Sequence, residues 1–468
     1  MTHVDCEAVF RRQHPLYRLN RPVWEKSRDA YAGGADYIRQ ALVKHVSEIE
    51  LEFEERLRRA CYFNYPRKIA RLITQFVLSA DAHRDGADPA LVEDFSRDGM
   101  RTVEVMRQFS TLLNLYGAAA LWVDMPFFDG EIDLERKSAE RLRPAVRALS
   151  PLEIVDWGEG ADGLLNWVLI EESDRLDAGP FLPAVEVRRR KLWTRDEYYI
   201  FERDAVTGRI AMPAAGRNPI GMVPIVYRTE ADGFRLGNGH YFEDVVCISD
   251  AILNNQSESQ MNLVKQMFGL LIISDSFARG ARREMQAAET GPAARFSHVL
   301  ARSAAIWEAP EERGISRYIS PSGADSACIR EENQMLKREL FDLVGMAWAP
   351  DLHQAQTAES KSWDFHAVRQ FLTSRVDLLE QAESKAWEIM RKFDPSVPVP
   401  KIAYNRDFSI PDLKSSVESL LGLKELYGGE AFQRELAETS LFLLEKVRKL
   451  SPDAREKIMR EIREGGHV

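Results

Sequence analysis

Residues 336–393 constrain the fold more than any other stretch, because they combine two helical patterns with a break between them. The first pattern, at 335–346, repeats large apolar side chains at helical spacing. Pro350 then ends it, since proline lacks an amide proton and disfavours the α conformation of the preceding residue. The second pattern begins after Thr357, a fair N-cap residue, with Glu359 in the first turn, where the helix dipole favours an anion.

The second pattern predicts one long helix that ends before Pro395. Its apolar stripe consists of Val368, Phe371, Leu372, Val376, Leu379, Ala382, Ala386, Ile389, Met390 and Phe393. Each large apolar side chain buried on such a stripe contributes about 1.5–3 kcal/mol. The stripe therefore needs a partner surface, and the polar break between the two helices needs a different explanation.

The sequence before this stretch changes from a helical period to a strand period. The first 90 or so residues are expected to be mostly helical, with one long helix continuing past Leu42 to Ala60. A second helix is expected from about Leu91 to Tyr116, where Gly117 is a natural terminator. A buried strand is expected at 119–123, and a further strand at 221–227. Between them the sequence predicts the strands of a meander, at 152–157, 165–170, 185–189, 191–194 and 198–201.

A small α/β insertion is expected between two further helices, at 241–268 and 325–346, which gives a stalk that carries a knob. The first of these helices has a polar middle that is nearly free of charge: Asn254, Asn255, Gln256 and Gln260. Two interpretations of this middle remain open, a contact with another polar surface and a turn that faces solvent. The insertion opens on a basic arm with Arg279, Arg282 and Arg283. A Pro-rich linker after Phe393 precedes helices at about 412–427, 430–449 and 452–464.

The composition limits the classes of function. The formal net charge of −10 argues against a protein that binds tightly by neutralising many phosphates, because such proteins carry basic surfaces. The four cysteines form no CxxC pair, which favours a reduced compartment, and no apolar run approaches the ~18 residues of a membrane helix. The chain also lacks a GxxxxGK[ST] loop, a GxSxG elbow and an HExxH motif. We therefore expect an α+β protein, cytoplasmic at synthesis, with no enzymatic activity, metal or cofactor.

An ordered series of residues along almost the whole chain resembles the portal proteins, the head–tail connectors of tailed bacteriophages. No single residue of the series is decisive; the order of the series, together with the plan of helix, knob, helix, break and long helix, carries the resemblance. The residues are Gly33, Gly34, Tyr37, Leu42, His45, Glu48, Arg56, Tyr62, Asn64, Gly117, Trp122, Asp124, Pro126, Arg143, Pro144, Glu153, Trp157, Pro224, Tyr227, Val344, Gly345, Met346 and Glu359 with the following Ser-Lys-Ser.

The resemblance implies a division of the chain into the parts of a portal subunit. These would be a wing of N-terminal helices and β-meander (1–235), a first stem helix (236–270), a clip (271–324), a second stem helix (325–346), a tunnel loop (347–356), a long wing helix (357–394) and a crown (395–468). The tunnel loop would bring Trp348, Asp351, Gln354 and Gln356 to the DNA channel. The bulky Trp348 is a departure, and whether it faces DNA or packs under a neighbour stays open.

The resemblance also implies the partners. Identical subunits, usually twelve, would form a ring at one capsid vertex of the virion, assembled in the host cytoplasm, with no membrane involved. Double-stranded DNA would pass without sequence specificity, and acidic walls would repel it rather than hold it. The clip arginines would dock the large terminase subunit and then the head-completion adaptor, unless they are a solvated basic arm; other partners would be the major capsid and scaffold proteins. The alternative is a structural, adaptor or scaffold protein of the virion that is not a portal.

Overall fold

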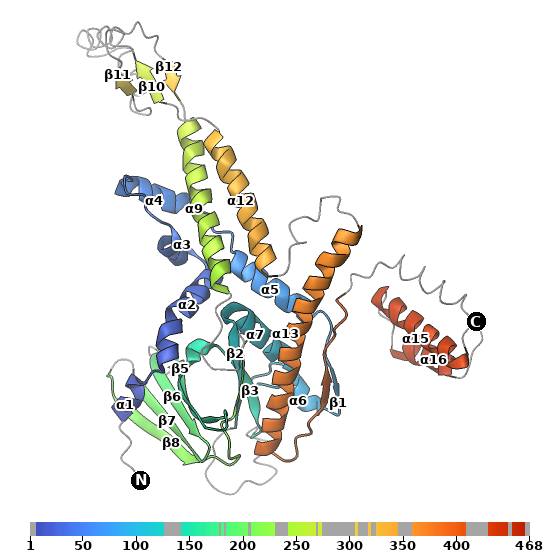
Figure 1. Ribbon diagram of the computed structural model, residues 1–468. Helices are drawn as coiled ribbons and strands as arrows, with labels where there is room; N and C mark the ends of the chain where they lie inside the picture. Colours follow the sequence, from blue (N-terminus) through green and yellow to red (C-terminus); the bar gives the residue numbers. More distant parts are fainter. Residues whose placement is uncertain are drawn as a thin grey trace. The chain divides into compact units, whose positions relative to one another are not determined.

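The computed structural model describes residues 6–125, 142–176, 179–181, 184–204, 207–229, 242–267, 270–273, 305–307, 317–319, 324–344, 358–408, 429–447 and 452–463 (Figure 1). These residues belong to two compact units, Met1–Arg406 and Asp407–Val468. Helices and strands are mixed, and the strands pair mainly with near neighbours in antiparallel sheets. The predicted α+β class is confirmed.

Seven helices occupy most of the first 116 residues. They are α1 (Cys6–Arg11), α2 (Pro15–Ala32), α3 (Ala35–Ala41), α4 (Glu50–Arg59), α5 (Tyr65–Val77), α6 (Pro89–Glu93) and α7 (Thr102–Tyr116). Local chemistry explains several ends. The Asn64 side chain accepts the Arg67 amide at the start of α5, and Gly117 adopts the left-handed conformation after α7, with φ of 67°.

Two helices predicted to be continuous are each divided, so both predictions are wrong. After α3 the chain is extended at Leu42, with ψ of 119°, and α4 begins only at Glu50. Between them the Val43 amide donates to Asn254 of a distant helix, a contact that the local sequence does not reveal. The helix expected from Leu91 is likewise divided into α6 and α7, because Asp94 accepts the Gly99 amide in a tight turn.

A three-stranded sheet with the order β3-β2-β9 forms the centre of the first unit. Its strands are β2 (Ala118–Asp124), β3 (Ala145–Leu149) and β9 (Ile225–Thr229). Both α7 and the long helix α13 (Ala358–Phe393) contact this sheet. Residues 118–123 of β2 are all buried, as expected for a strand with both faces covered.

The predicted meander is a five-stranded antiparallel sheet with the order β4-β5-β6-β7-β8. It consists of β4 (Ile154–Glu159), which follows the 3-10 turn η1 (Pro151–Glu153), β5 (Leu165–Leu176), β6 (Val185–Thr194), β7 (Glu197–Asp204) and β8 (Ile210–Arg217). Strands expected at 185–189 and 191–194 are one strand, β6. The arginines in the middle of β6 form ion pairs with the neighbouring strands, where Arg189 lies 2.6 Å from Glu202 and Arg190 lies 2.5 Å from Glu171.

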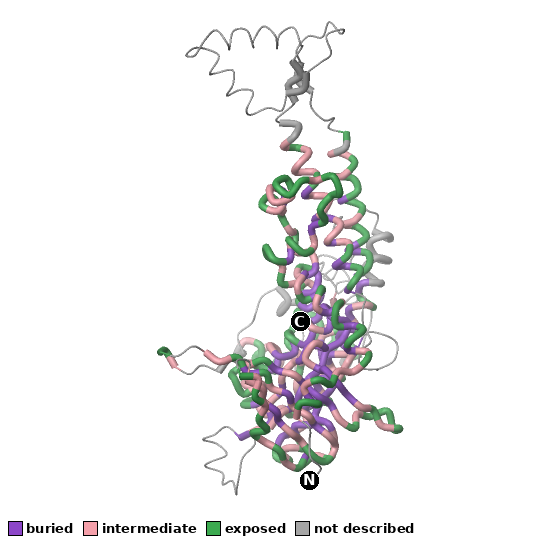
Figure 2. The backbone as a smooth tube through the Cα atoms, turned by 90° about the vertical axis from the view of Figure 1, so that its left-hand side faces the viewer, coloured by how far each residue is buried: buried purple, intermediate pink, exposed green. Residues whose placement is uncertain are grey.

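The predicted stalk consists of α9 (Phe242–Met267) and α12 (Ala324–Leu343), which pack side by side (Figure 1). Between them in the sequence lies a sheet with the order β11-β10-β12, made of β10 (Leu270–Ile273), β11 (Ala305–Trp307) and β12 (Arg317–Ile319). After α13, the strand β13 (Lys401–Ala403) pairs with β1 (His83–Asp85). Figure 2 shows that the buried residues concentrate at the base of the hairpin and in the body below it.

The second unit contains α15 (Glu430–Val447) and α16 (Pro452–Arg463), which contact each other. The bounds of both helices agree closely with the ranges expected from the sequence, 430–449 and 452–464. The helix expected at 412–427 lies outside the described residues. Among the helices that the structure describes, none is both long and apolar enough to cross a membrane.

Candidate functional site

The buried apolar residues that the structure describes in the hairpin of α9 and α12 lie toward its base. With 26 residues, α9 extends over about 39 Å at 1.5 Å per residue. The buried apolar residues of the two helices are Phe242, Val245, Val246, Ile252, Leu253, Leu340 and Phe341. Further along, the contact is polar, because Asn255 Nδ2 donates to Asn333 Oδ1 of α12 at 3.2 Å. At this level of the hairpin the two helices are joined by side-chain amides.

A second contact fixes α9 to the connector between α3 and α4. The Asn254 side chain donates to the Ala41 carbonyl at 3.0 Å and accepts the Val43 amide at 2.9 Å. Both partners are backbone groups that would need another partner if Asn254 were removed. The structure thus places Asn254 and Asn255 in contacts within the chain, one with the connector and one with α12.

Charged and phenolic groups join the same region of α9 to α2 and α3. The Tyr37 hydroxyl donates to Asp250, which also lies 2.9 Å from Lys26 Nζ. Burial, together with the hydrogen bond to Asp250, raises the pKa of Tyr37 well above its usual value. The neutral phenol is therefore a permanent donor at neutral pH. Burial likewise raises the pKa of Tyr62, whose ring packs 5.0 Å from that of Tyr37, to about 12.

The connector and α4 form a segment, residues 42–59, that we call the arm. Its base is fixed by Arg56, whose side chain is buried and donates to Glu48 at 2.9 Å and to the carbonyl of Val43. The arm nevertheless exposes large apolar side chains: Val43 at 68%, Val46 at 102%, Ile49 at 60% and Leu51 at 75%. Four exposed apolar side chains within nine residues make the arm a candidate surface for contact with another protein.

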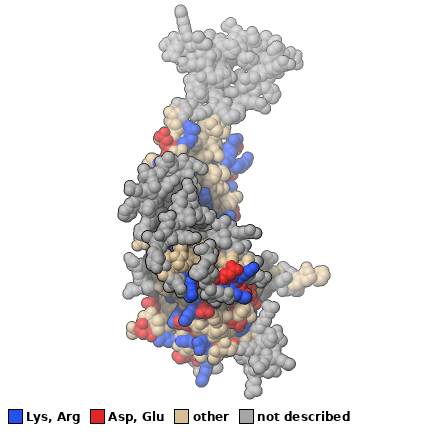
Figure 3. Space-filling view, turned by 90° about the vertical axis from the view of Figure 1, so that its right-hand side faces the viewer, with Lys and Arg blue, Asp and Glu red and all other residues tan. Residues whose placement is uncertain are grey.

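The hairpin also exposes apolar side chains outside its core. Leu263 on α9 is 55% exposed, and Met335 and Leu343 on α12 are 64% and 42% exposed. The arm and the hairpin thus offer two separate apolar surfaces in one unit. The face of the molecule in Figure 3 has lysine and arginine interspersed with acidic side chains over the body.

Most of the sequence-predicted site residues lie outside the described residues. These are Trp348, Asp351, Gln354 and Gln356 of the proposed tunnel loop, and Arg279, Arg282 and Arg283 of the proposed clip. Gln256 and Gln260 on α9 are half-buried. Within the described ranges, no group of three or more His, Cys, Asp or Glu side chains could hold a metal ion.

Sequence reasoning missed the arm. The spacing of Val43, Val46 and Ile49 is three residues, which reads as one face of a helix. These side chains lie in solvent because the chain leaves the helix at Leu42 and residues 42–49 form an irregular connector. The nearby acidic residues Glu48, Glu50 and Glu52 were the one local signal, because they indicate a solvated segment rather than a core helix.

Comparisons with known proteins give structural neighbours alone. No protein-family model and no curated protein matches the sequence. Among solved structures, a chain from the neck of an empty GTA particle matches with a TM-score of 0.41 and 12% identity, covering 81% of this chain and 89% of that one. A chain from the virion of a native gene transfer agent (GTA) particle matches with a TM-score of 0.43 and 14% identity, over the same shares of the two chains.

Proposed function

We propose that this chain is a portal subunit, which forms a closed ring at one capsid vertex and conducts DNA during packaging and ejection. One observation carries the proposal: the hairpin of α9 and α12 encloses a small sheet in the sequence, and the 36-residue helix α13 follows it. This is the order of stem, clip, stem and long wing helix that the sequence resemblance implies.

The exposed apolar surfaces support a ring. Closed rings need head-to-tail contacts, in which one side of a subunit binds the opposite side of the next. In the proposal the arm and the exposed apolar side chains of the hairpin are the two complementary surfaces, and each large side chain that becomes buried contributes about 1.5–3 kcal/mol. In the proposed ring the arm residues Val46, Ile49 and Leu51 contact the hairpin of the neighbouring subunit.

The charge of the chain supports a conduit rather than a DNA clamp. The formal net charge is −10, and affinity for duplex DNA rises with every phosphate that a protein neutralises. In the proposal, Trp348, Gln354 and Gln356 face the channel as part of the tunnel loop. Arg279, Arg282 and Arg283 dock the terminase and then the adaptor, and the energy for packaging comes from that separate ATPase.

Charge introduced on the arm tests the ring contact. The double substitution Val46→Glu/Ile49→Glu should abolish rings and leave a folded monomer, as measured by light scattering after gel filtration. The matched control is Leu164→Glu, in the turn between β4 and β5, where the leucine is 64% exposed but outside both surfaces. The control should keep its rings. Rings that survive the arm substitutions, or that are lost equally in the control, would reject the proposed contact.

A further inference from the structure

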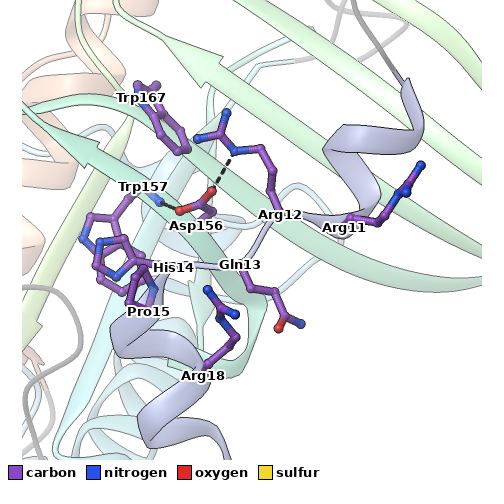
Figure 4. Close-up of a pocket in the computed structure, with 9 residues that line it drawn as sticks. All are labelled: Arg11, Arg12, Gln13, His14, Pro15, Arg18, Asp156, Trp157 and Trp167. Atoms are coloured by element: carbon purple, nitrogen blue, oxygen red, sulfur yellow. Dashed lines mark hydrogen bonds and ion pairs between the residues drawn. The ribbon is translucent and has the colours of Figure 1, made fainter.

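A cleft of about 470 Å³ lies where the connector between α1 and α2 crosses strands β4 and β5 (Figure 4). Arginine and tryptophan side chains dominate its lining, as the close-up shows. It belongs to neither the arm nor the hairpin. A volume of this size accommodates a small ligand or a few residues of a peptide.

The cleft is preformed, because the connector is fixed at both ends. Arg190 of β6 donates to the carbonyls of Val9 at 2.6 Å and Arg12 at 3.1 Å. The His14 amide donates to the Val155 carbonyl of β4 at 2.9 Å. A ligand would therefore meet side chains that are already positioned, which lowers the entropic cost of binding.

Both tryptophan faces that meet the cleft are already covered. The His14 ring stacks on Trp157, with centroids 3.8 Å apart and planes inclined by 15°. The Arg12 guanidinium lies 4.8 Å above the Trp167 ring. Trp167 also lies so close to Gly158 of the neighbouring strand that a Cβ there would be 2.3 Å from the indole nitrogen. His14 and Arg12 thus occupy indole faces on which a nucleic-acid base could otherwise stack.

The polar groups of the cleft are mainly hydrogen-bond donors. Its one carboxylate, Asp156, already accepts the Arg12 Nε at 2.9 Å and the Trp157 amide at 3.0 Å. Arg11 and Arg18 are exposed, and neither forms an ion pair with any residue that the structure describes. The lining thus carries three guanidinium groups and a single carboxylate.

The imidazole of His14 adds one more donor. Its Nδ1 accepts the Leu16 amide at 3.2 Å, which assigns the proton of the neutral ring to Nε2. Burial lowers the pKa of His14, although Asp156 and Glu159 oppose the shift. The ring is therefore neutral at pH 7 and donates through Nε2.

We infer that this cleft binds an acidic peptide segment of a partner protein, through Arg11, Arg18 and the outer nitrogens of Arg12. Clusters of arginine recognise carboxylates by charge-assisted hydrogen bonds. A nucleic acid fits less well, because the aromatic faces on which its bases would stack are covered. The inference does not depend on ring formation.

Fluorescence anisotropy with a fluorescein-labelled hexaglutamate peptide tests the inference on the full-length protein. Hexaglutamate should bind saturably and weaken with salt, whereas hexaglutamine should not bind. The pair Arg11→Gln/Arg18→Gln should weaken binding about tenfold, as expected for two partly screened ion pairs. Unlabelled hexaglutamate should displace the probe at lower concentrations than inorganic phosphate or a single-stranded oligonucleotide does.

Two matched variants make the result specific to the cleft. Arg58→Gln/Arg391→Gln removes two exposed arginines elsewhere and should leave the affinity unchanged. Asp156→Asn removes the one acid of the lining and should tighten binding. Circular dichroism establishes that each variant is folded. Equal loss in the two arginine pairs, stronger displacement by the oligonucleotide, or no binding of hexaglutamate by the wild-type protein would each overturn the inference.

Discussion

The buried ion pair between Arg84 and Glu383 gives the sharpest prediction about stability. Glu383 on α13 is 0% exposed, and Arg84 on β1 binds it through two nitrogens, at 2.6 and 3.0 Å. Tyr404 and Trp387 also donate to this carboxylate, the latter at 3.2 Å. The pair therefore joins α13 to the β1–β13 sheet. We predict that Arg84→Met destabilises the protein strongly although it preserves most of the packing of the side chain.

The magnitude follows from burial. Removing one partner of a buried ion pair leaves an uncompensated charge and costs about 3–5 kcal/mol. The control is Arg406, a partly exposed arginine that binds two carboxylates of the same helix, Asp377 at 2.7 Å and Glu380 at 3.0 Å. Each exposed pair contributes at most about 1 kcal/mol, so Arg406→Met should cost less than Arg84→Met.

Urea unfolding followed by circular dichroism measures both effects, with equal m values as the condition for comparing them. The double variant Arg84→Met/Glu383→Gln should recover most of the loss, because glutamine is uncharged and its Oε1 can still accept from Trp387 while its amide nitrogen donates to the Tyr404 oxygen. Equal costs for Arg84→Met and Arg406→Met would refute the reasoning from burial. A double variant no more stable than Arg84→Met would refute the reasoning from charge.

Two further predictions concern the junction of α9 with the N-terminal helices. Asn254→Ala should leave the two backbone groups that this side chain binds without a partner, which lowers the free energy of unfolding by about 1–3 kcal/mol. Faster amide exchange is therefore expected across 42–49. Asn255→Ala should leave that exchange unchanged. The raised pKa of Tyr62 means that folding favours the neutral phenol. The resulting contribution to the free energy of unfolding is complete below pH 10 and is lost as pH rises to about 12. Tyr62→Phe should make the urea midpoint fall less steeply over that window; an unchanged slope would contradict the assignment.

The local sequence pattern was sufficient to predict the longest helices. The prediction of a helix beginning after Thr357 agrees with α13, which begins at Ala358 and ends at Phe393. Its apolar stripe was predictable because every residue that defines it lies within the helix. The burial of Glu383 was not, since its partner Arg84 lies 299 residues away.

Strands without a local signal were missed for the same reason. β8 contains Pro213 and Gly216, which both disfavour strands, but it lies at the edge of its sheet, where proline is tolerated. Gly216 allows Tyr198 to pack against it, because a Cβ there would lie 2.6 Å from the phenolic oxygen. β1 and β13 form only as each other's partner.

The candidate sites also depend partly on local sequence and partly on packing. Asn254 stands out in the sequence as part of an uncharged stretch in a long helix, but its contact with the connector depends on packing. The cleft combines Arg12 and His14 with Trp157 and Trp167, which come together only when β4 and β5 pair. No local sequence motif indicates such a site.

The mass of the purified full-length protein by native mass spectrometry, with negative-stain images of the same sample, tests the central claim most directly. Twelve copies of the 53.4 kDa chain would give a closed ring of roughly 640 kDa with a central hole. The proposal predicts such rings, assembled either by the chain alone or on co-expression with capsid proteins. A monomer or dimer under all of these conditions would contradict it and leave an adaptor as the better explanation.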